Sequence, residues 1–163
     1  MTEQELAAWL RLSFVPKLGM KRLKRLLAID SPQNLADYSH QQLTAIGFSD
    51  SQIAYLKFKT EPLVEECLAW QAQSPTHHIV THQCAAYPPC LRQIASAPGT
   101  LFVRGNISTL SDPQIAMVGS RNASLEGLQT AKAFAREFTQ SGLIVTSGLA
   151  LGIDGYAHDG DLE

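Results

Sequence analysis

Two short loops near the end of the chain carry residue types that suit a phosphate ligand. The first is Gly119–Arg121, followed closely by Ser124, and the second is Ser147-Gly148. Glycine lets a backbone N–H group approach a ligand, hydroxyls can donate to phosphate oxygens, and the arginine fork matches phosphate geometry. These types predict a site for a nucleotide or nucleic-acid phosphate. The residues assigned to it are Gly119, Ser120, Arg121, Ser124, Ser147 and Gly148.

The pattern around the loops predicts the elements that position them. Each loop follows a short apolar run, Ile115–Val118 or Leu143–Thr146, and the first run is typical of a strand buried on both faces. Between the runs, Ser124 is a good N-cap for a helix that should end near Gly142. One face of this helix is apolar: Leu128, Ala131, Ala135 and Phe138. A right-handed βαβ crossover would bring both loops to the carboxyl edge of a parallel sheet, where ligands of such sheets bind.

Several nucleotide-binding and catalytic signatures are missing from this region. The loops match neither the G-x-G-x-x-G fingerprint nor a Walker loop. Asp154 and His158, four residues apart, could form an acid/base pair on one helix face. We favour the alternative that Asp154 caps the helix while His158 packs or hydrogen-bonds nearby. Since no recognisable nucleophile accompanies them, we expect a binding protein rather than an enzyme.

The first 75 residues predict a separate domain of short helices. Turns at Val15–Gly19 and Leu43–Gly47 share an apolar-x-x-apolar-Gly pattern typical of a helix-hairpin-helix, which can sit on a DNA backbone. Many helical hairpins turn on a glycine only to pack, so that alternative stays open. Six basic residues lie between Arg11 and Arg25. Those we name as auxiliary DNA contacts are Lys17, Lys21 and Arg22.

After Ser74-Pro75 the pattern changes to strands that alternate with helices. Short strands are expected at His78–Thr81 and Thr100–Val103, ahead of the βαβ unit. We therefore predict an α/β domain with a parallel, Rossmann-like sheet over residues 76–163, preceded by the helical domain at residues 1–75.

Composition sets the broad class of the protein. The chain has 163 residues, of which 45% are hydrophobic and 17% charged, as in a folded globular protein. Acidic Glu3 and Glu5 replace the basic start of an export signal, so we expect a cytoplasmic location. The three cysteines have no CxxC spacing, and the nearby histidines fit no zinc pattern. We therefore expect reduced thiols, no metal ion and no cofactor.

Four stretches of the sequence resemble the DNA-processing protein A family (DprA, also called Smf). They are VGSRNAS at Val118–Ser124, SGLALGIDGYAH at Ser147–His158, YPPCL at Tyr87–Leu91 and APGTLFVRG at Ala97–Gly105. The helical N-terminus is similar to the SAM-like domain that many members carry. The resemblance thus extends over nearly the whole chain.

This resemblance implies a protein of natural transformation and DNA recombination. Such proteins bind incoming single-stranded DNA, protect it and help to load a RecA-type recombinase, with Ser120-Arg121 and Ser147-Gly148 matching the family's phosphate pocket. The family continues past His158 with elements that carry a pocket lysine, the homodimer surface and recombinase contacts. Residues 76–163 therefore match only the first part of its Rossmann domain. We assign no dimer to this chain and expect its exposed sheet edge to promote self-association.

Two alternatives use the same features differently. A Rossmann-like nucleotide-binding enzyme, similar to the phosphoribohydrolases, could use the same phosphate pocket, although its expected PGGxGT-type loop is not found in the sequence. The helical N-terminus could also be a protein-interaction domain.

Overall fold

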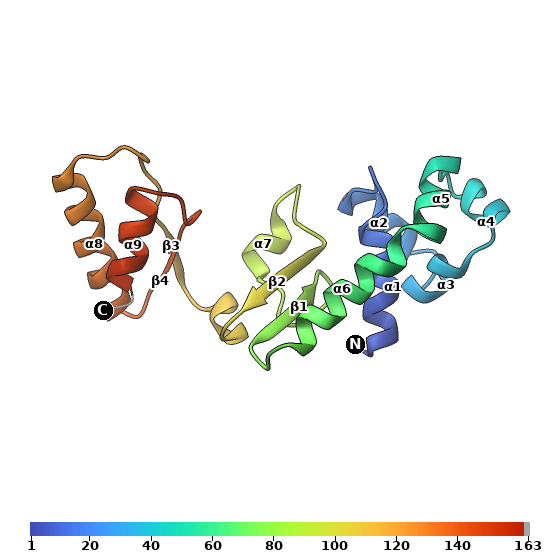
Figure 1. Ribbon diagram of the computed structural model, residues 1–163, viewed down its shortest axis with the longest axis horizontal. Helices are drawn as coiled ribbons and strands as arrows, with labels where there is room; N and C mark the ends of the chain where they lie inside the picture. Colours follow the sequence, from blue (N-terminus) through green and yellow to red (C-terminus); the bar gives the residue numbers. More distant parts are fainter. Residues whose placement is uncertain (162–163) are drawn as a thin grey trace. The chain divides into compact units, whose positions relative to one another are not determined.

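The computed structural model describes residues 1–161 and has a mixed α/β architecture (Figure 1). The chain forms two compact units, Met1–Leu110 and Ser111–Glu163, hereafter unit 1 and unit 2. Unit 1 holds the helical N-terminus and a two-stranded sheet, and unit 2 holds a second two-stranded sheet with two helices.

Six helices form the first part of unit 1, as the sequence predicts. Several of them start at a capping side chain: Thr2, Ser39 and Ser49 each accept a hydrogen bond from the backbone N–H three residues on. The helices are α1 (Glu3–Ser13), α2 (Met20–Leu27), α3 (Pro32–Asp37), α4 (His40–Ala45), α5 (Asp50–Phe58) and α6 (Thr60–Ala72).

The core of unit 1 surrounds Trp9, which has no exposed surface. Its indole packs among apolar side chains from the helices and the two glycine turns, and its Nε1–H donates to Thr100 Oγ1 at 2.9 Å. The buried members of this cluster include Leu12, Val15, Leu18, Leu23, Leu26, Leu35, Leu43, Phe48, Ile53 and Leu56.

The remaining strands of unit 1 differ from the prediction. Strands β1 (His77–Thr81) and β2 (Thr100–Arg104) lie where expected but pair with each other in antiparallel fashion, with His77 opposite Arg104. Helix α6 packs beside β1, so this sheet belongs to the compact unit of the helices (Figure 1). The expectation that all strands after residue 75 share one parallel sheet is therefore wrong. Between the strands lies α7 (Pro89–Gln93).

Unit 2 contains the predicted βαβ element. Strands β3 (Gln114–Ala116) and β4 (Ile144–Thr146) pair in parallel, with Ile115 opposite Val145. Helix α8 (Leu125–Gln140) connects them, and α9 (Ile153–Asp161) packs along α8 (Figure 1). A 3₁₀ turn, η1 (Ile107–Ser111), precedes β3. The chain leaves α8 through Gly142, whose φ of 81° is the left-handed conformation expected after a helix.

The first strand of this element is shorter and more exposed than predicted. β3 ends at Ala116, and the Val118 side chain is 79% exposed. A strand is buried on both faces only when neighbouring strands and helices cover them, and β3 pairs with β4 alone among the described strands. On the side of the sheet that is covered, Ile115 of β3 packs against a small buried cluster. This cluster consists of Ala135 of α8, Val145 of β4 and Ala157 of α9.

Two further observations concern organisation. The compact units divide after Leu110, whereas the sequence signals place a domain boundary near residue 75. In the part of the chain that the structure describes, no helix has the length and apolar character required to cross a membrane.

Candidate phosphate-binding site

The loops after β3 and β4 meet within unit 2, at the start of α9. The backbone N–H of Ile153 donates to the carbonyl oxygen of Ser120 at 3.2 Å. Gly152 lies against the same segment, because a Cβ there would collide with the carbonyl oxygens of Ser120 and Arg121. A Cβ on Gly119 would likewise collide with the Ile153 side chain. The sequence therefore brings both predicted loops to one edge of the sheet.

The first loop presents donors to solvent. Within residues 1–161, the N–H groups of Gly119, Ser120 and Arg121 donate to no protein acceptor. These three residues are exposed, and Arg121 forms no ion pair with the described residues. Successive free N–H groups beside a guanidinium are a typical anion-binding arrangement. The Ser120 hydroxyl instead accepts from the Asn122 N–H at 3.1 Å, which fixes the turn.

Ser124 acts as a helix cap in the structure. Its hydroxyl oxygen accepts a hydrogen bond from the Gly127 N–H at 3.2 Å, as its role at the N-terminus of α8 predicts. This bond does not use the hydroxyl proton, and Ser124 is exposed to solvent. The cap orients α8 directly behind the first loop.

The second loop is held by α9. Ser147 Oγ lies 2.8 Å from His158 Nε2 and accepts a hydrogen bond from the Leu149 N–H at 3.1 Å. Leu149 itself has a φ of 54°, a left-handed conformation that is uncommon for a leucine. His158 thus contacts a residue assigned to the site, in agreement with the interpretation that it hydrogen-bonds nearby.

Gly148 contributes to the loop in a way the sequence does not indicate. Its N–H donates to Asp154 Oδ2 at 3.0 Å, and Asp154 is only 6% exposed. This N–H is therefore already used by a carboxylate. Asp154 is the second residue of α9 and bonds six residues back to the loop, so the expectation that it caps the helix is wrong.

The basic residues of unit 1 divide into two groups. Lys17 and Lys21 are exposed on either side of Gly19, which precedes α2 and provides no side-chain cap. Arg22 is engaged within the protein: its Nη2 donates to the Gly47 carbonyl at 2.5 Å, and its guanidinium lies 5.0 Å from the centre of the Phe48 ring. Arg22 thus joins α2 to the second glycine turn, Leu43–Gly47.

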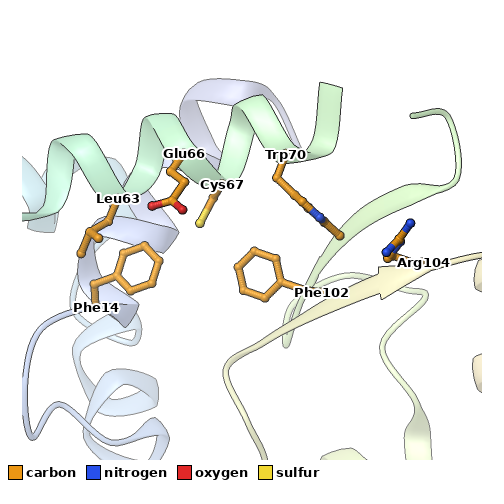
Figure 2. Close-up of a pocket in the computed structure, with 7 residues that line it drawn as sticks. All are labelled: Phe14, Leu63, Glu66, Cys67, Trp70, Phe102 and Arg104. Atoms are coloured by element: carbon orange, nitrogen blue, oxygen red, sulfur yellow. The ribbon is translucent and has the colours of Figure 1, made fainter. Parts of the chain in front are cut away.

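A separate cavity lies within unit 1, among α1, α6 and β2 (Figure 2). It has a volume of about 510 Å³ and mostly apolar and aromatic walls. Trp70 meets Phe102 edge-on, with ring centres 5.5 Å apart, and stacks on His77. None of the residues assigned to the phosphate site lines this cavity. Its lining residues are Phe14, Leu63, Glu66, Cys67, Trp70, Phe102 and Arg104.

The cysteines and histidines form no metal centre in the described residues. Cys67, Cys84 and Cys90 are all free thiols. Burial raises the pKa of the Cys67 thiol, with a smaller contribution from the negative charge of Glu66. A raised thiol pKa disfavours the reactive thiolate.

Three residues that hold the site together were not assigned to it from the sequence: Gly152, Asp154 and His158. The spacing of Asp154 and His158 placed them on one helix face, but not against a loop that precedes the helix. The glycine-rich segment between β4 and α9 is the sequence feature that could have indicated these residues. A glycine such as Gly152, with a left-handed φ, allows two backbone segments to approach closely.

Comparison with known proteins identifies the family of this chain. The family model described as DNA recombination-mediator protein A matches residues 78–163, more than half of the chain. The chain belongs to the DprA/Smf family. A second model of this family, the SMF/DprA SAM domain, matches residues 1–69. Residues 70–77 lie between the two matches.

The relatives that match are members of the same family. Protein Smf of Escherichia coli (strain K12) is 34% identical over 95% of this chain and 41% of its own length. The DNA processing protein DprA of Streptococcus pneumoniae is 39% identical over 47% of this chain and 27% of its own. The X-ray structure of a DprA from S. pneumoniae matches with a TM-score of 0.70 and 26% identity, covering 99% of this chain and 54% of that one. This chain therefore spans about two fifths of Smf and half of the solved DprA.

Proposed function

We propose that the chain binds single-stranded DNA by holding a backbone phosphate between its two loops. The observation that carries the proposal is the exposed first loop, where Arg121 and three free N–H groups lie together beside the start of α9. A phosphate oxygen can accept several of these donors at once, and the arginine adds a charge-assisted bond.

We further propose that this binding serves DNA processing in the cytoplasm, as in natural transformation and recombination, with a RecA-type recombinase as the partner. Relatives that carry the name DNA processing protein DprA support this proposal. The role is one of binding rather than catalysis. Elsewhere in the chain, exposed Lys17 and Lys21 beside the uncapped start of α2 offer an auxiliary contact to a DNA backbone.

The salt dependence of binding tests the proposal. For single strands, the logarithm of the association constant should fall with the logarithm of salt concentration with a slope of about −0.7 for each neutralised phosphate. Arg121→Ala should weaken binding of a labelled oligo(dT) and make this slope less steep by about that amount. Fluorescence anisotropy over a series of salt concentrations measures both quantities.

Lys59→Ala is the matched control, because Lys59 is exposed and belongs to unit 1, where it follows the last residue of α5, whereas the two loops belong to unit 2. It removes one positive charge without touching the site and should leave the slope close to that of the parent chain. An equal change in both variants would mean that Arg121 acts through net charge alone, which would contradict the proposed contact. Release of a free base from a nucleoside monophosphate would instead favour the nucleotide-binding enzyme.

A further inference from the structure

The hydroxyl of Ser147 has two hydrogen-bonding neighbours in the protein, Leu149 and His158, and one hydrogen-bonding position left for a ligand. A serine hydroxyl has one proton to donate and two lone pairs to accept. The Leu149 N–H uses one lone pair, at 3.1 Å, and His158 Nε2 lies 2.8 Å away on the other side. The protonation of His158 Nε2 therefore decides whether the hydroxyl offers a proton or a lone pair to a bound phosphate.

Two arrangements are possible, and they have opposite consequences for an anion. When His158 Nε2 carries no proton, it accepts the Ser147 proton, and the hydroxyl turns a lone pair toward the ligand. When Nε2 carries a proton, it donates to Ser147 Oγ, both lone pairs are used, and the hydroxyl proton is free for a phosphate oxygen. The imidazolium has only the second arrangement, and its positive charge adds attraction for an anion.

Charged groups on the surrounding elements do not substitute for this effect. Among the described residues, His158 is in no ion pair, and β4 carries no charged side chain. Lys132 of α8 pairs with Asp159 at 2.6 Å, and the Asp154 carboxylate is bonded to the Gly148 N–H. The charged residues on the elements packed around His158 include Asp154 and Asp159 of α9, Glu126, Lys132, Arg136 and Glu137 of α8, and Arg121 of the first loop.

We propose that His158 is a positioning residue that turns the Ser147 hydroxyl proton toward the bound phosphate when its Nε2 is protonated. The inference rests on the proposed phosphate site and assigns a regulation to it. The protein then binds the phosphate backbone most tightly with a protonated His158, and binding takes up a proton. Affinity therefore falls as the pH rises and His158 loses this proton.

Binding of oligo(dT) as a function of pH tests this proposal, because neither its thymines nor its phosphodiesters titrate where histidine does. The dissociation constant should rise about tenfold between pH values of about 5.5 and 8, as expected for a linked pKa change of about one unit. His158→Gln, which keeps a hydrogen-bonding side chain that cannot titrate, should remove this dependence. His40→Gln, in unit 1 and distant in sequence from the loops, should retain it.

A second measurement does not depend on the stability of any variant. The imidazole of His158 can be followed by NMR in the full chain, and its pKa should rise when oligo(dT) is added. An unchanged His158 titration, or a His158→Gln variant with the parent pH dependence, would overturn the inference while Arg121-dependent binding still supported the proposed function. Absence of oligo(dT) binding at every pH would overturn both.

Discussion

The substitution Gly152→Ala tests whether close backbone packing holds the two loops together. Gly152 has a φ of 85°, and a Cβ on it would collide with the Ser120 and Arg121 carbonyl oxygens. An alanine in the left-handed region costs about 1–2 kcal/mol, and overpacking adds about 1–3 kcal/mol. We expect unit 2 to lose about 2–5 kcal/mol, a large part of the stability of a small domain.

Gly142→Ala is the matched control for this change. Gly142 has a similar φ of 81° and lies in the same unit, but no atom lies within 4 Å of the position of a Cβ. It should cost only the backbone term of about 1–2 kcal/mol. The difference between the two variants isolates the collision, and about 1–3 kcal/mol corresponds to roughly 5- to 150-fold in an opening equilibrium.

Hydrogen exchange of the backbone amides of α8 measures these losses. Both tryptophans, Trp9 and Trp70, belong to unit 1, so their fluorescence does not report directly on unit 2. Exchange in α8 should be faster in Gly152→Ala than in Gly142→Ala by the factor above. Equal exchange in the two variants would show that the loops move apart at no cost, and the reasoning about the site's rigidity would fail.

Three further predictions concern unit 1 and can be followed by urea unfolding with tryptophan fluorescence. Arg22→Ala should lower the free energy of unfolding by about 1–2 kcal/mol, because it removes a hydrogen bond to Gly47 and a contact with the Phe48 ring. Lys21→Ala should leave it nearly unchanged, and equal losses in the two variants would contradict the structural role of Arg22. Trp9→Phe should cost about 1–3 kcal/mol through lost packing and the lost bond to Thr100, and a neutral effect would argue against the core described. Burial lowers the pKa of His82, with smaller contributions from Lys24 and Arg92, so the unfolded chain takes up a proton that the folded chain resists. Stability should therefore fall as the pH drops below about 6.5, and His82→Gln should reduce this loss.

The elements of this fold could be predicted where the signals are local. Ser124 caps α8 because its hydroxyl bonds three residues on, and Gly142 ends the connection because it adopts a left-handed φ. The start and the end of α8 depend only on residues close in sequence, so the sequence alone predicts both. The parallel pairing of β3 with β4 followed from the helix between them, since a crossover of that length favours parallel strands.

Long-range features were harder to predict. An apolar run such as Thr100–Val103 has the same pattern in a parallel or an antiparallel pair, and in the structure it pairs with β1 and contacts Trp9 and Trp70, residues far away in sequence. In the site, the glycine and serine residues indicated a phosphate. The use of the Gly148 N–H by Asp154 depends on the direction in which α9 leaves its loop. Arg22 shows the same limit, because a count of basic residues does not reveal which of them are bonded internally.

The buried carboxylate of Asp154 has a consequence for the kind of phosphate that the loops would accept. The Asp154 carboxylate places a negative charge behind the second loop, while Arg121 and the free N–H groups lie on the first. A phosphodiester inside a DNA strand carries one negative charge, whereas a terminal phosphomonoester carries about 1.5 to 2 near neutral pH. Repulsion from Asp154 opposes that additional charge. The loops would therefore select positions within a strand over its phosphorylated ends and over free nucleotides.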